Sequence, residues 1–269
     1  MERPIFVFAQ PRSGSTLLQR LLNSIDEACI YGEHLGILKG VADSYLGFMN
    51  HRNRANFCSE VPNDDSFKMH ISKVLRNSGA FIAGANGLTQ EQVRTAYKGF
   101  LRTLLHPLSD PKIHRWGFKE IRYGVGDSVF EMLLELFPDA SFIFLVRNPD
   151  DVLQSIEATG WWDTSFDENL QNWISQAINF QKSHLAHPQS TILIKYEDLI
   201  DWSSKAAYRL FDWLDFKLTS RQADILFKMP KIGAAERKPS LTYDAQNKIR
   251  SACSRPEISR LYPACVATS

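Results

Sequence analysis

The sequence predicts an α/β protein in which helices cover both faces of a parallel sheet. Three short runs, 5–9, 142–146 and 191–194, are almost wholly apolar, so neither face of these strands is polar. Such strands are typical of parallel sheets buried on both sides, whereas half-exposed strands alternate apolar and polar residues. Helical patterns separate the three runs. Strands that alternate with helices indicate βαβ units and a doubly wound sheet.

Length and charge limit what the protein does. A chain of 269 residues buries about 75% of its unfolded surface, and no repeat, low-complexity run or linker divides it. We therefore expect one domain over residues 1–269. Lys and Arg number 31 against 30 Asp and Glu, without the basic excess typical of proteins that bind nucleic acid or anionic membranes. Any strong anion site is then local and built from a few placed cations.

The cysteines and the N-terminus predict a cytoplasmic protein. Four cysteines lie far apart without zinc-site spacing, so reduced thiols are expected, and only Cys253 and Cys265 are close enough in sequence to suggest a disulfide. No stretch approaches the roughly 18 apolar residues of a membrane span. A strand-like run begins at Ile5, which leaves no room for a signal peptide. We expect a soluble protein without a membrane partner.

The elements follow in order from the N-terminus. The strand at 5–9 leads through a short loop into a helix after Ser15, where leucines recur at helical spacing. A polar stretch from about 47 to 111 then interrupts the alternation and holds helix-like pieces at 67–75 and 90–105. We interpret this stretch as a helical insertion, which either caps a site or serves only in helical packing.

The alternation resumes in the second half of the chain. Residues 116–118 form a fourth candidate strand, and a helical pattern over 129–136 stops before Pro138. After the strand at 142–146, Pro149 occupies a first helical position. Further helices are expected at 167–185, 205–214 and 220–227.

The strongest functional motif is Pro11-Arg12-Ser13-Gly14-Ser15-Thr16, between the first strand and its helix. A helix N-terminus directs unpaired N–H groups and a positive dipole end at whatever lies in such a loop. Gly14 permits close backbone approach, Arg12 supplies a full charge, and the hydroxyls of Ser13, Ser15 and Thr16 add donors. A 5′-phosphate or sulfate is the natural ligand. The alternative is a serine N-cap beside a chance arginine.

This loop is not a Walker A sequence, because it lacks the first glycine and the lysine of GxxxxGK[ST]. No apolar strand ends in an aspartate suited to magnesium, although Glu197 and Asp198 follow the last strand and keep that idea open. A hydrolysed triphosphate is therefore disfavoured.

A second cation, Arg147, follows the strand at 142–146, where ligands bind in open α/β sheets. Ser155 lies about two turns into the next helix and is able to face the same region. Taken alone, an arginine after a strand is more often a surface cation. The loop at 11–16 and the segment that carries Arg147 indicate a function only when they are considered together.

Together these segments resemble the sulfotransferase family, which uses 3′-phosphoadenosine 5′-phosphosulfate (PAPS). The loop at 11–16 looks like its 5′-phosphosulfate loop in the arginine form, and Arg147 with Ser155 matches the pair that holds the 3′-phosphate. Lys195-Tyr196-Glu197-Asp198-Leu199 resembles the [KR]YEDL segment, whose tyrosine lies near the adenine. Gly233 and Arg237-Lys238-Pro239-Ser240 look like the basic loop that closes over the 3′-phosphate. The four motifs occur in family order.

The resemblance implies a three-layer fold related to P-loop NTPases, with a central parallel sheet of about five strands. It implies PAPS as co-substrate, adenosine 3′,5′-bisphosphate (PAP) as product, and no metal. In related enzymes a lysine placed like Lys119, after 116–118, contacts the sulfuryl group and stabilises the transition state. A solvated lysine at a strand end is the alternative, and Glu120 and Arg122 are expected simply to pair.

The resemblance gives two candidates for the general base, Glu33 and His34, which stand side by side after the first helix. Glu33 occupies the position where the arginine-loop type of the family has its glutamate, so we prefer it. His34 has an intrinsic pKa nearer neutrality and suits base catalysis without tuning. A third possibility is that neither acts.

We therefore expect sulfuryl transfer to a hydroxyl or amine of a small-molecule acceptor, for example in natural-product metabolism. A nucleotide-dependent kinase on a related fold and a non-catalytic nucleotide-binding scaffold remain the alternatives. Trp161 and Trp162 either line an acceptor pocket or belong to the core. No motif identifies the acceptor or the oligomeric state.

Overall fold

The structure is a computed structural model that describes residues 3–50, 89–106, 110–123, 128–160, 163–227 and 241–262. The chain divides into two compact units. The first comprises Met1–Gly36, Pro107–Gly126 and Asp139–Ser269, and the second comprises Ile37–His106 and Asp127–Pro138. The single domain expected from the sequence stays a prediction.

The second unit is helical in the part that is described. Its helices are α2 (Leu38–Met49), α5 (Gln90–Leu105) and α6 (Ser128–Leu136). The bounds of α5 are those expected, because the side chains of Thr89 and Gln92 form a reciprocal capping box at its start. Helix α6 also ends before Pro138 as predicted, whereas α2 was missed. The expected helical piece at 67–75 lies outside the described residues.

The first unit is built on a five-stranded sheet, which confirms the predicted fold class. The strands are β1 (Ile5–Ala9), β2 (Ala28–Tyr31), β3 (Arg115–Glu120), β4 (Ser141–Val146) and β5 (Thr191–Lys195), in the order β2-β3-β1-β4-β5. All neighbouring strands are parallel. The sequence did not reveal β2, because this short edge strand has Cys29 and Tyr31 partly or largely exposed and lacks the fully apolar pattern.

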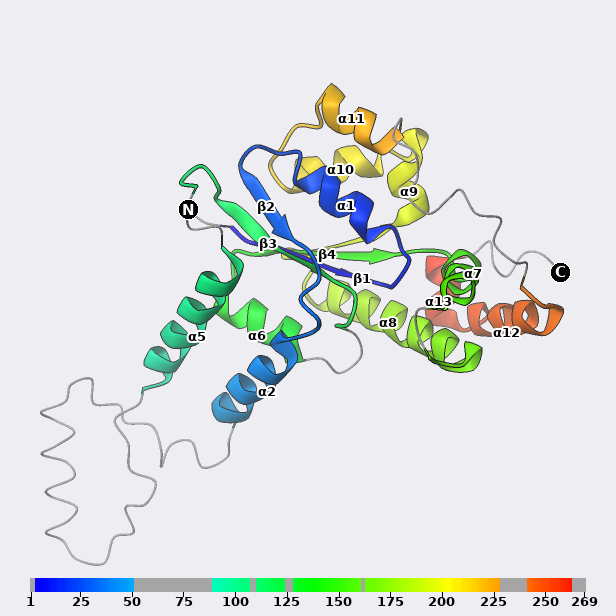
Figure 1. The fold of residues 1–269 in the computed structure, drawn as a ribbon, viewed down its shortest axis with the longest axis horizontal. Helices are drawn as coiled ribbons and strands as arrows, with labels where there is room; N and C mark the ends of the chain where they lie inside the picture. Colours follow the sequence, from blue (N-terminus) through cyan, green and yellow to red (C-terminus); the bar gives the residue numbers. More distant parts are fainter. Residues whose placement is uncertain are drawn as a thin grey trace, which may run out of the picture. The chain divides into compact units, whose positions relative to one another are not determined.

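Helices cover both faces of this sheet (Figure 1). They are α1 (Ser15–Leu22), α7 (Pro149–Thr159), α8 (Phe166–Ala186), α9 (Tyr196–Ile200), α10 (Ala206–Trp213), α11 (Ser220–Phe227), α12 (Tyr243–Cys253) and α13 (Pro256–Leu261), with a 3-10 turn at Trp202–Ser204. Figure 1 shows α1, α9, α10 and α11 on one face and α8, α12 and α13 on the other. The helices expected near 167–185, 205–214 and 220–227 are confirmed as α8, α10 and α11.

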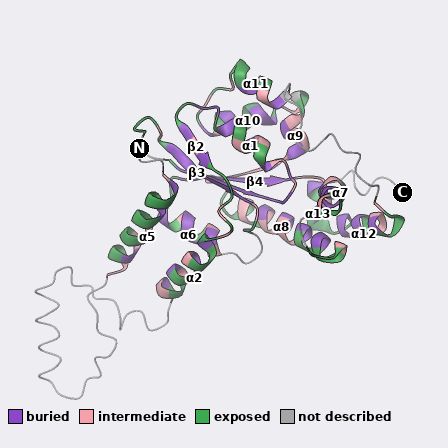
Figure 2. Cartoon of the chain, in the orientation of Figure 1, coloured by how far each residue is buried: buried purple, intermediate pink, exposed green. Residues whose placement is uncertain are grey.

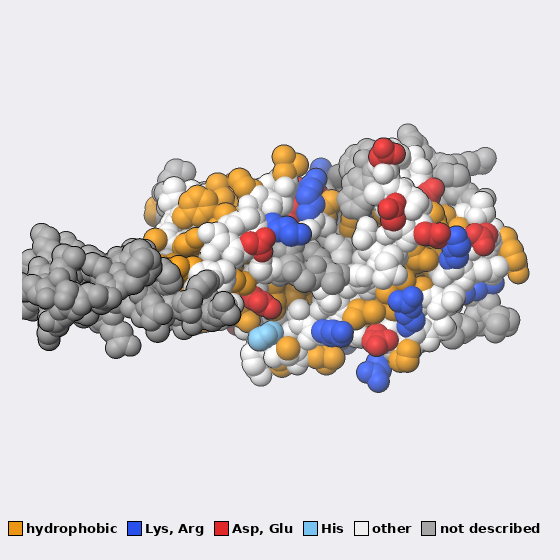
Figure 3. All heavy atoms as spheres, turned by 90° about the horizontal axis from the view of Figure 1, so that it is seen from below, with side chains coloured by type: hydrophobic (Ala, Val, Ile, Leu, Met, Phe, Trp, Pro, Cys, Tyr) orange, Lys and Arg blue, Asp and Glu red, His pale blue; other side chains and the backbone are white. Residues whose placement is uncertain are grey.

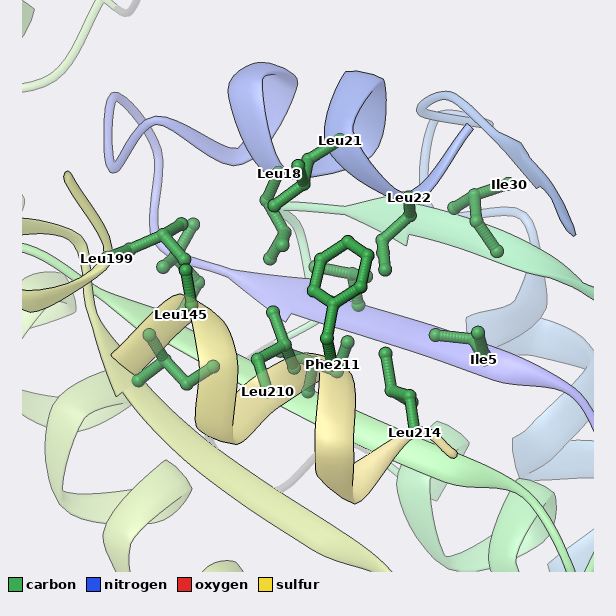
Figure 4. Close-up of a cluster of buried hydrophobic side chains, with 14 of the residues drawn as sticks. Ile5, Leu18, Leu21, Leu22, Ile30, Leu145, Leu199, Leu210, Phe211 and Leu214 are labelled. Carbon is green, nitrogen blue, oxygen red and sulfur yellow. The ribbon is translucent and has the colours of Figure 1, made fainter. Parts of the chain in front are cut away.

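Strands β1 and β4 are buried along their whole length (Figure 2). The two faces of the sheet bury different side chains, because successive strand residues point to opposite sides. On one face, aliphatic residues of β1 and β4 pack on α1, α9 and α10 (Figure 4). On the other face Phe6 and Phe8 meet Phe142 and Phe144, and Phe144 stacks on Phe180 of α8 with ring centroids 5.0 Å apart. Each fully buried leucine or phenylalanine contributes about 1.5–3 kcal/mol. The core therefore fixes the strands whose ends carry the site.

The sequence also led us to expect no membrane span and suggested at most one disulfide. Among the described helices, none has the length and apolar character needed to cross a membrane. Cys265, one half of the only disulfide that the sequence suggested, lies outside the described residues.

Candidate active site

The candidate residues of the first unit gather at the carboxyl edge of its sheet. Parallel strands place their carboxyl ends together, and ligands of open α/β sheets bind there. Along this edge, loops or helices begin directly after Tyr31, Glu120, Ala9, Val146 and Lys195, in the order of the strands. The register pairs Phe8 with Glu120 and Ala9 with Leu145, so the strand ends are level.

The loop after β1 turns through two left-handed residues, Arg12 with φ 57° and Gly14 with φ 86°. The amide and the hydroxyl of Ser13 both donate to the Gln10 carbonyl, at 3.3 and 2.5 Å. Helix α1 begins at Ser15, so its first N–H groups point into the loop. The strand–loop–helix arrangement is the one expected. The Ser13 hydroxyl proton, however, is used within the loop, while Thr16 is exposed.

Gln10 is a functional candidate that sequence reasoning passed over. Its side chain is fully buried and donates to the Trp173 carbonyl at 3.0 Å, while its Oε1 accepts from the Arg147 amide at 3.2 Å. The Trp173 indole in turn donates to the Arg147 carbonyl at 3.0 Å. Gln10 therefore ties the anion loop to the end of β4 and to α8. A polar residue immediately after a fully apolar strand was the available signal.

Tyr196 packs directly on the loop. A Cβ built on Gly14 would lie 2.3 Å from two carbons of the Tyr196 ring, so only glycine fits beneath the tyrosine. Burial raises the pKa of Tyr196, although the neighbouring Arg147 opposes that rise. The phenol therefore stays neutral and serves as a flat wall of the loop.

Arg147 joins the loop to this wall. Its guanidinium carbon lies 4.7 Å from the centre of the Tyr196 ring, and its Nη1 donates to the Arg12 carbonyl at 3.1 Å. Its Nη2 pairs with Asp151 at 2.9 Å, and its buried Nε has no hydrogen-bond partner among the described residues. An unpaired buried donor is costly. This nitrogen is a ready donor for a ligand oxygen.

Ser155 faces the same region, as its position in α7 predicted. Its hydroxyl accepts from the Nε of Arg12 at 2.9 Å. Arg12, Arg147 and Ser155 thus belong to one network, in which two guanidinium groups and a hydroxyl converge at the loop. The structure therefore brings together residues that the resemblance assigns to the 5′-phosphosulfate and to the 3′-phosphate of PAPS.

A second cluster lies at the ends of β2 and β3. The Glu33 carboxylate accepts from the Lys119 ammonium at 2.5 Å and from the Arg122 guanidinium at 3.0 Å, one on each oxygen. Lys119 is buried, with 3% of its surface exposed, whereas the Arg122 and Glu33 side chains are about one-third exposed. The solvated-lysine alternative for Lys119 is therefore wrong. Arg122 was noticed only as a possible partner of Glu120.

The half-buried ring of His34 is held by two internal partners. Its Nδ1 contacts the Glu120 carboxylate at 2.9 Å, and its Nε2 lies 3.3 Å from the Tyr123 hydroxyl. Glu120 also pairs with Arg122 at 2.8 Å, as expected. Burial alone would raise the pKa of Glu120, but hydrogen bonds from His34, the Ile121 and Gly36 amides and Arg122 outweigh it and hold the pKa below its usual range. Glu120 is therefore a buried carboxylate anion.

Several predicted residues lie outside the described part of the chain. They are Trp161, Trp162, Gly233, Arg237, Lys238, Pro239 and Ser240. Their assignments stay predictions.

The geometry of this edge alone does not identify the protein family, and a comparison with protein families does. A sequence model of the sulfotransferase family matches residues 4–220. The chain belongs to the sulfotransferase family. The match includes both clusters at the sheet edge, and membership supports sulfotransferase activity. A search of curated proteins gave no match.

One solved sulfotransferase domain shares the fold of this chain. The sulfotransferase domain of the Synechococcus PCC 7002 olefin synthase is 18% identical, with a TM-score of 0.53 over 93% of this chain and 88% of that domain. A sulfotransferase from Mycobacterium tuberculosis is 16% identical, with a TM-score of 0.49 over 94% of this chain and 77% of that one. A mouse sulfotransferase complexed with PAP is 12% identical, with a TM-score of 0.48 over 89% of this chain and 69% of that one. The first match confirms the P-loop-like fold that the sequence predicted.

Proposed function

We propose that this sulfotransferase moves the sulfuryl group of PAPS to a hydroxyl or amine of a small-molecule acceptor and releases PAP. The observation that carries the proposal is the convergence of Arg12, Arg147 and Ser155 on the loop after β1, beside the wall formed by Tyr196. Two fixed guanidinium groups and a helix N-terminus suit a ligand with a phosphate or sulfate at two separate positions.

The proposed donor site fits the residues that are present. Arg12 and the amides of the loop at 11–16 hold the 5′-phosphosulfate, and Arg147 with Ser155 holds the 3′-phosphate. The buried Nε of Arg147 supports this assignment, because a ligand oxygen would supply its missing partner. The adenine is proposed to lie near Tyr196. Arg237 and Lys238 are proposed to close over the 3′-phosphate from outside the described residues.

The second cluster supplies the proposed chemistry. A lone pair of the acceptor forms a bond to sulfur while the bond from sulfur to the phosphate oxygen breaks, and that oxygen leaves with the electron pair on PAP. Glu33 takes the proton of the acceptor, since a carboxylate within reach of the substrate can act as a general base. An ammonium has three N–H donors, and Lys119 uses one of them on Glu33. Lys119 and Arg12 stabilise the charge that develops on the sulfuryl and leaving oxygens.

Glu33 is a better candidate for the base than His34. Both ring nitrogens of His34 contact internal partners, Glu120 and Tyr123, so the imidazole has no further acceptor. Each Glu33 oxygen accepts from Lys119 or Arg122 but keeps a second lone-pair site for the proton of the acceptor. Glu33 is about one-third exposed at the edge where the acceptor arrives. The third possibility, that neither residue acts, is separated from these two by mutation.

Ligand binding tests the donor assignment. PAP is expected to raise the thermal unfolding midpoint, whereas 5′-AMP is expected to have a much smaller effect because it lacks the 3′-phosphate that engages Arg147. Equal effects of the two nucleotides would contradict the proposal. A panel of phenols, alcohols and amines, followed by release of PAP from PAPS, then identifies the acceptor class. Stabilisation by PAP without transfer to any acceptor would favour the scaffold alternative.

Mutation tests the base. Glu33→Gln is expected to lower kcat at least about 100-fold, the usual contribution of a general base, while PAP binding changes less than about 3-fold. Asp215→Asn is the control, because Asp215 pairs with Arg3 before the amino end of β1 and not at the carboxyl edge. Near-normal turnover of Glu33→Gln at saturating PAPS would exclude Glu33 as the base. The absence of metal dependence, a cytoplasmic location and the lack of nucleic-acid partners stay predictions from the sequence.

A further inference from the structure

The buried side chain of Glu120 links two loops of the site. One carboxylate oxygen accepts from the His34 amide at 3.1 Å, the His34 ring at 2.9 Å and the Gly36 amide at 3.0 Å. The other accepts from the Ile121 amide at 2.9 Å, the Arg122 amide at 3.3 Å and the Arg122 guanidinium at 2.8 Å. The first set comes from the segment after β2 and the second from the segment after β3. Glu120 is fully buried.

The segment after β2 depends on this carboxylate for its shape. Leu35 and Gly36 are consecutive left-handed residues, with φ of 59° and 70°. A left-handed leucine is disfavoured, because its Cβ crowds the backbone. Glu120 accepts hydrogen bonds from the amides of His34 and Gly36, which lie on either side of Leu35. The carboxylate thus fixes a turn that this part of the backbone would otherwise avoid.

The same group controls the surroundings of Glu33. Glu33 immediately precedes the clamped turn, and the Arg122 guanidinium bridges the two carboxylates through one nitrogen, 2.8 Å from Glu120 and 3.0 Å from Glu33. Lys119, which holds the other oxygen of Glu33, is the neighbour of Glu120 on β3. We propose that Glu120 is a positioning residue, which fixes Glu33 between Lys119 and Arg122 in the orientation that accepts the proton. This inference rests on the proposed function.

The chemistry of the network requires a carboxylate. An ionised carboxylate is an acceptor at both oxygens, which matches six contacts from four backbone amides, one imidazole and one guanidinium. Glutamine would direct an NH₂ group at one of the two donor sets. Aspartate keeps the charge but is one methylene too short to reach both loops. The structure therefore predicts a graded loss from glutamate through aspartate to glutamine.

The experiment compares Glu120→Gln, Glu120→Asp and the control Asp215→Asn with the wild type. Glu120→Gln is expected to lower kcat at least 30-fold with the best acceptor of the panel, while KM for PAPS changes less than 3-fold. Glu120→Asp is expected to recover part of that loss. Amide hydrogen exchange is expected to quicken at His34 and Gly36 in both variants. Asp215→Asn should leave all three quantities unchanged.

Two outcomes would overturn the inference. One is a kcat within 3-fold of the wild type in Glu120→Gln; if this variant does not fold, a wild-type kcat in Glu120→Asp has the same meaning. The other is unchanged exchange at His34 and Gly36. PAP binding separates this failure from failure of the proposed function. Stabilisation of the wild type by PAP, together with either outcome, rejects the positioning role alone, whereas no stabilisation of the wild type rejects the donor assignment.

Discussion

At the scale of single residues, the site depends on groups that have no substitute at their positions. Gly14 is the clearest example, because the Tyr196 ring occupies the space where a side chain would begin. The anion loop and the wall that we propose for the adenine are thereby specified together. A glycine in such a loop is usually explained by its freedom to adopt positive φ. At Gly14, the contact with the Tyr196 ring is a second reason why a larger residue does not fit.

Replacing Gly14 separates these two causes. Gly14→Ala is expected to weaken PAP binding at least 10-fold, because the new methyl group displaces the Tyr196 ring. Gly160→Ala is a matched control, since Gly160 is also left-handed, with φ 57°, and a Cβ there meets no atom of the described residues within 4 Å. Both variants should lose about 1 kcal/mol of stability from backbone strain. Calorimetric titration with PAP measures the difference; equal affinities would contradict the role of the ring.

Glu120 gives a second prediction, for the dependence of stability on pH. Its pKa in the folded state lies below the ordinary 4.5, so the unfolded state binds the proton more readily. The stabilisation is therefore complete above about pH 4.5 and is lost as the pH falls toward the folded pKa. We expect the free energy of unfolding to decrease from about pH 5 to pH 3, and less steeply in Glu120→Gln.

Urea unfolding across this pH range measures the effect. Asp215→Asn is the control, because the Asp215 side chain is 66% exposed and its pair with Arg3 contributes little. The same pH slope in Glu120→Gln as in the wild type would show that other carboxylates account for the acid sensitivity.

At the scale of elements, the sequence predicted best those segments whose pattern is strong. Strands β1, β4 and β5 are apolar on both faces, and their bounds agree with the prediction to within one residue. Helix α5 has a capping box and was placed without error. Helix α9 was missed, because Tyr196 and its neighbours form a single short turn after β5 that leaves no periodic pattern.

The close approach of β3 to the central strand β1 explains why residue 117 is a glycine. Gly117 in β3 pairs with Ile5, and a Cβ built there would lie 1.9 Å from the Ile5 carbonyl oxygen. We expect Gly117→Ala to lower the free energy of unfolding by about 3 kcal/mol or more, since the two strands must separate. Gly99→Ala in α5 is the control, because no atom of the part of the chain that the structure describes would lie within 4 Å of the new Cβ, and alanine favours helices. It should gain about 0.5–1 kcal/mol. A wild-type unfolding midpoint for Gly117→Ala would contradict the close approach.

At the scale of the whole molecule, positive and negative charges nearly balance along the sequence, and folding brings a few cations together at one site. The net charge is +1, and Figure 3 shows Lys, Arg, Asp and Glu side chains interspersed on the face seen there. Within the first unit, Arg12, Lys119 and Arg147 come from different strand ends and meet at one edge. Motif order predicted that meeting. The internal partners did not follow from the sequence, because Gln10 and Glu120 act through contacts with residues more than 80 positions away.

The division of the chain gives the last prediction. All described residues of the proposed donor site belong to the first unit, so PAP should stabilise that unit above all. At 100 times its Kd, a ligand that binds only the folded state adds about 2.7 kcal/mol, which slows exchange through global opening roughly 100-fold. We expect this slowing in β1 and β4 of the first unit, and a change below about 3-fold in α5 of the second. Hydrogen exchange with 5′-AMP as control measures both. Slowing confined to α5 would place the nucleotide on the second unit and contradict the donor site at the sheet edge.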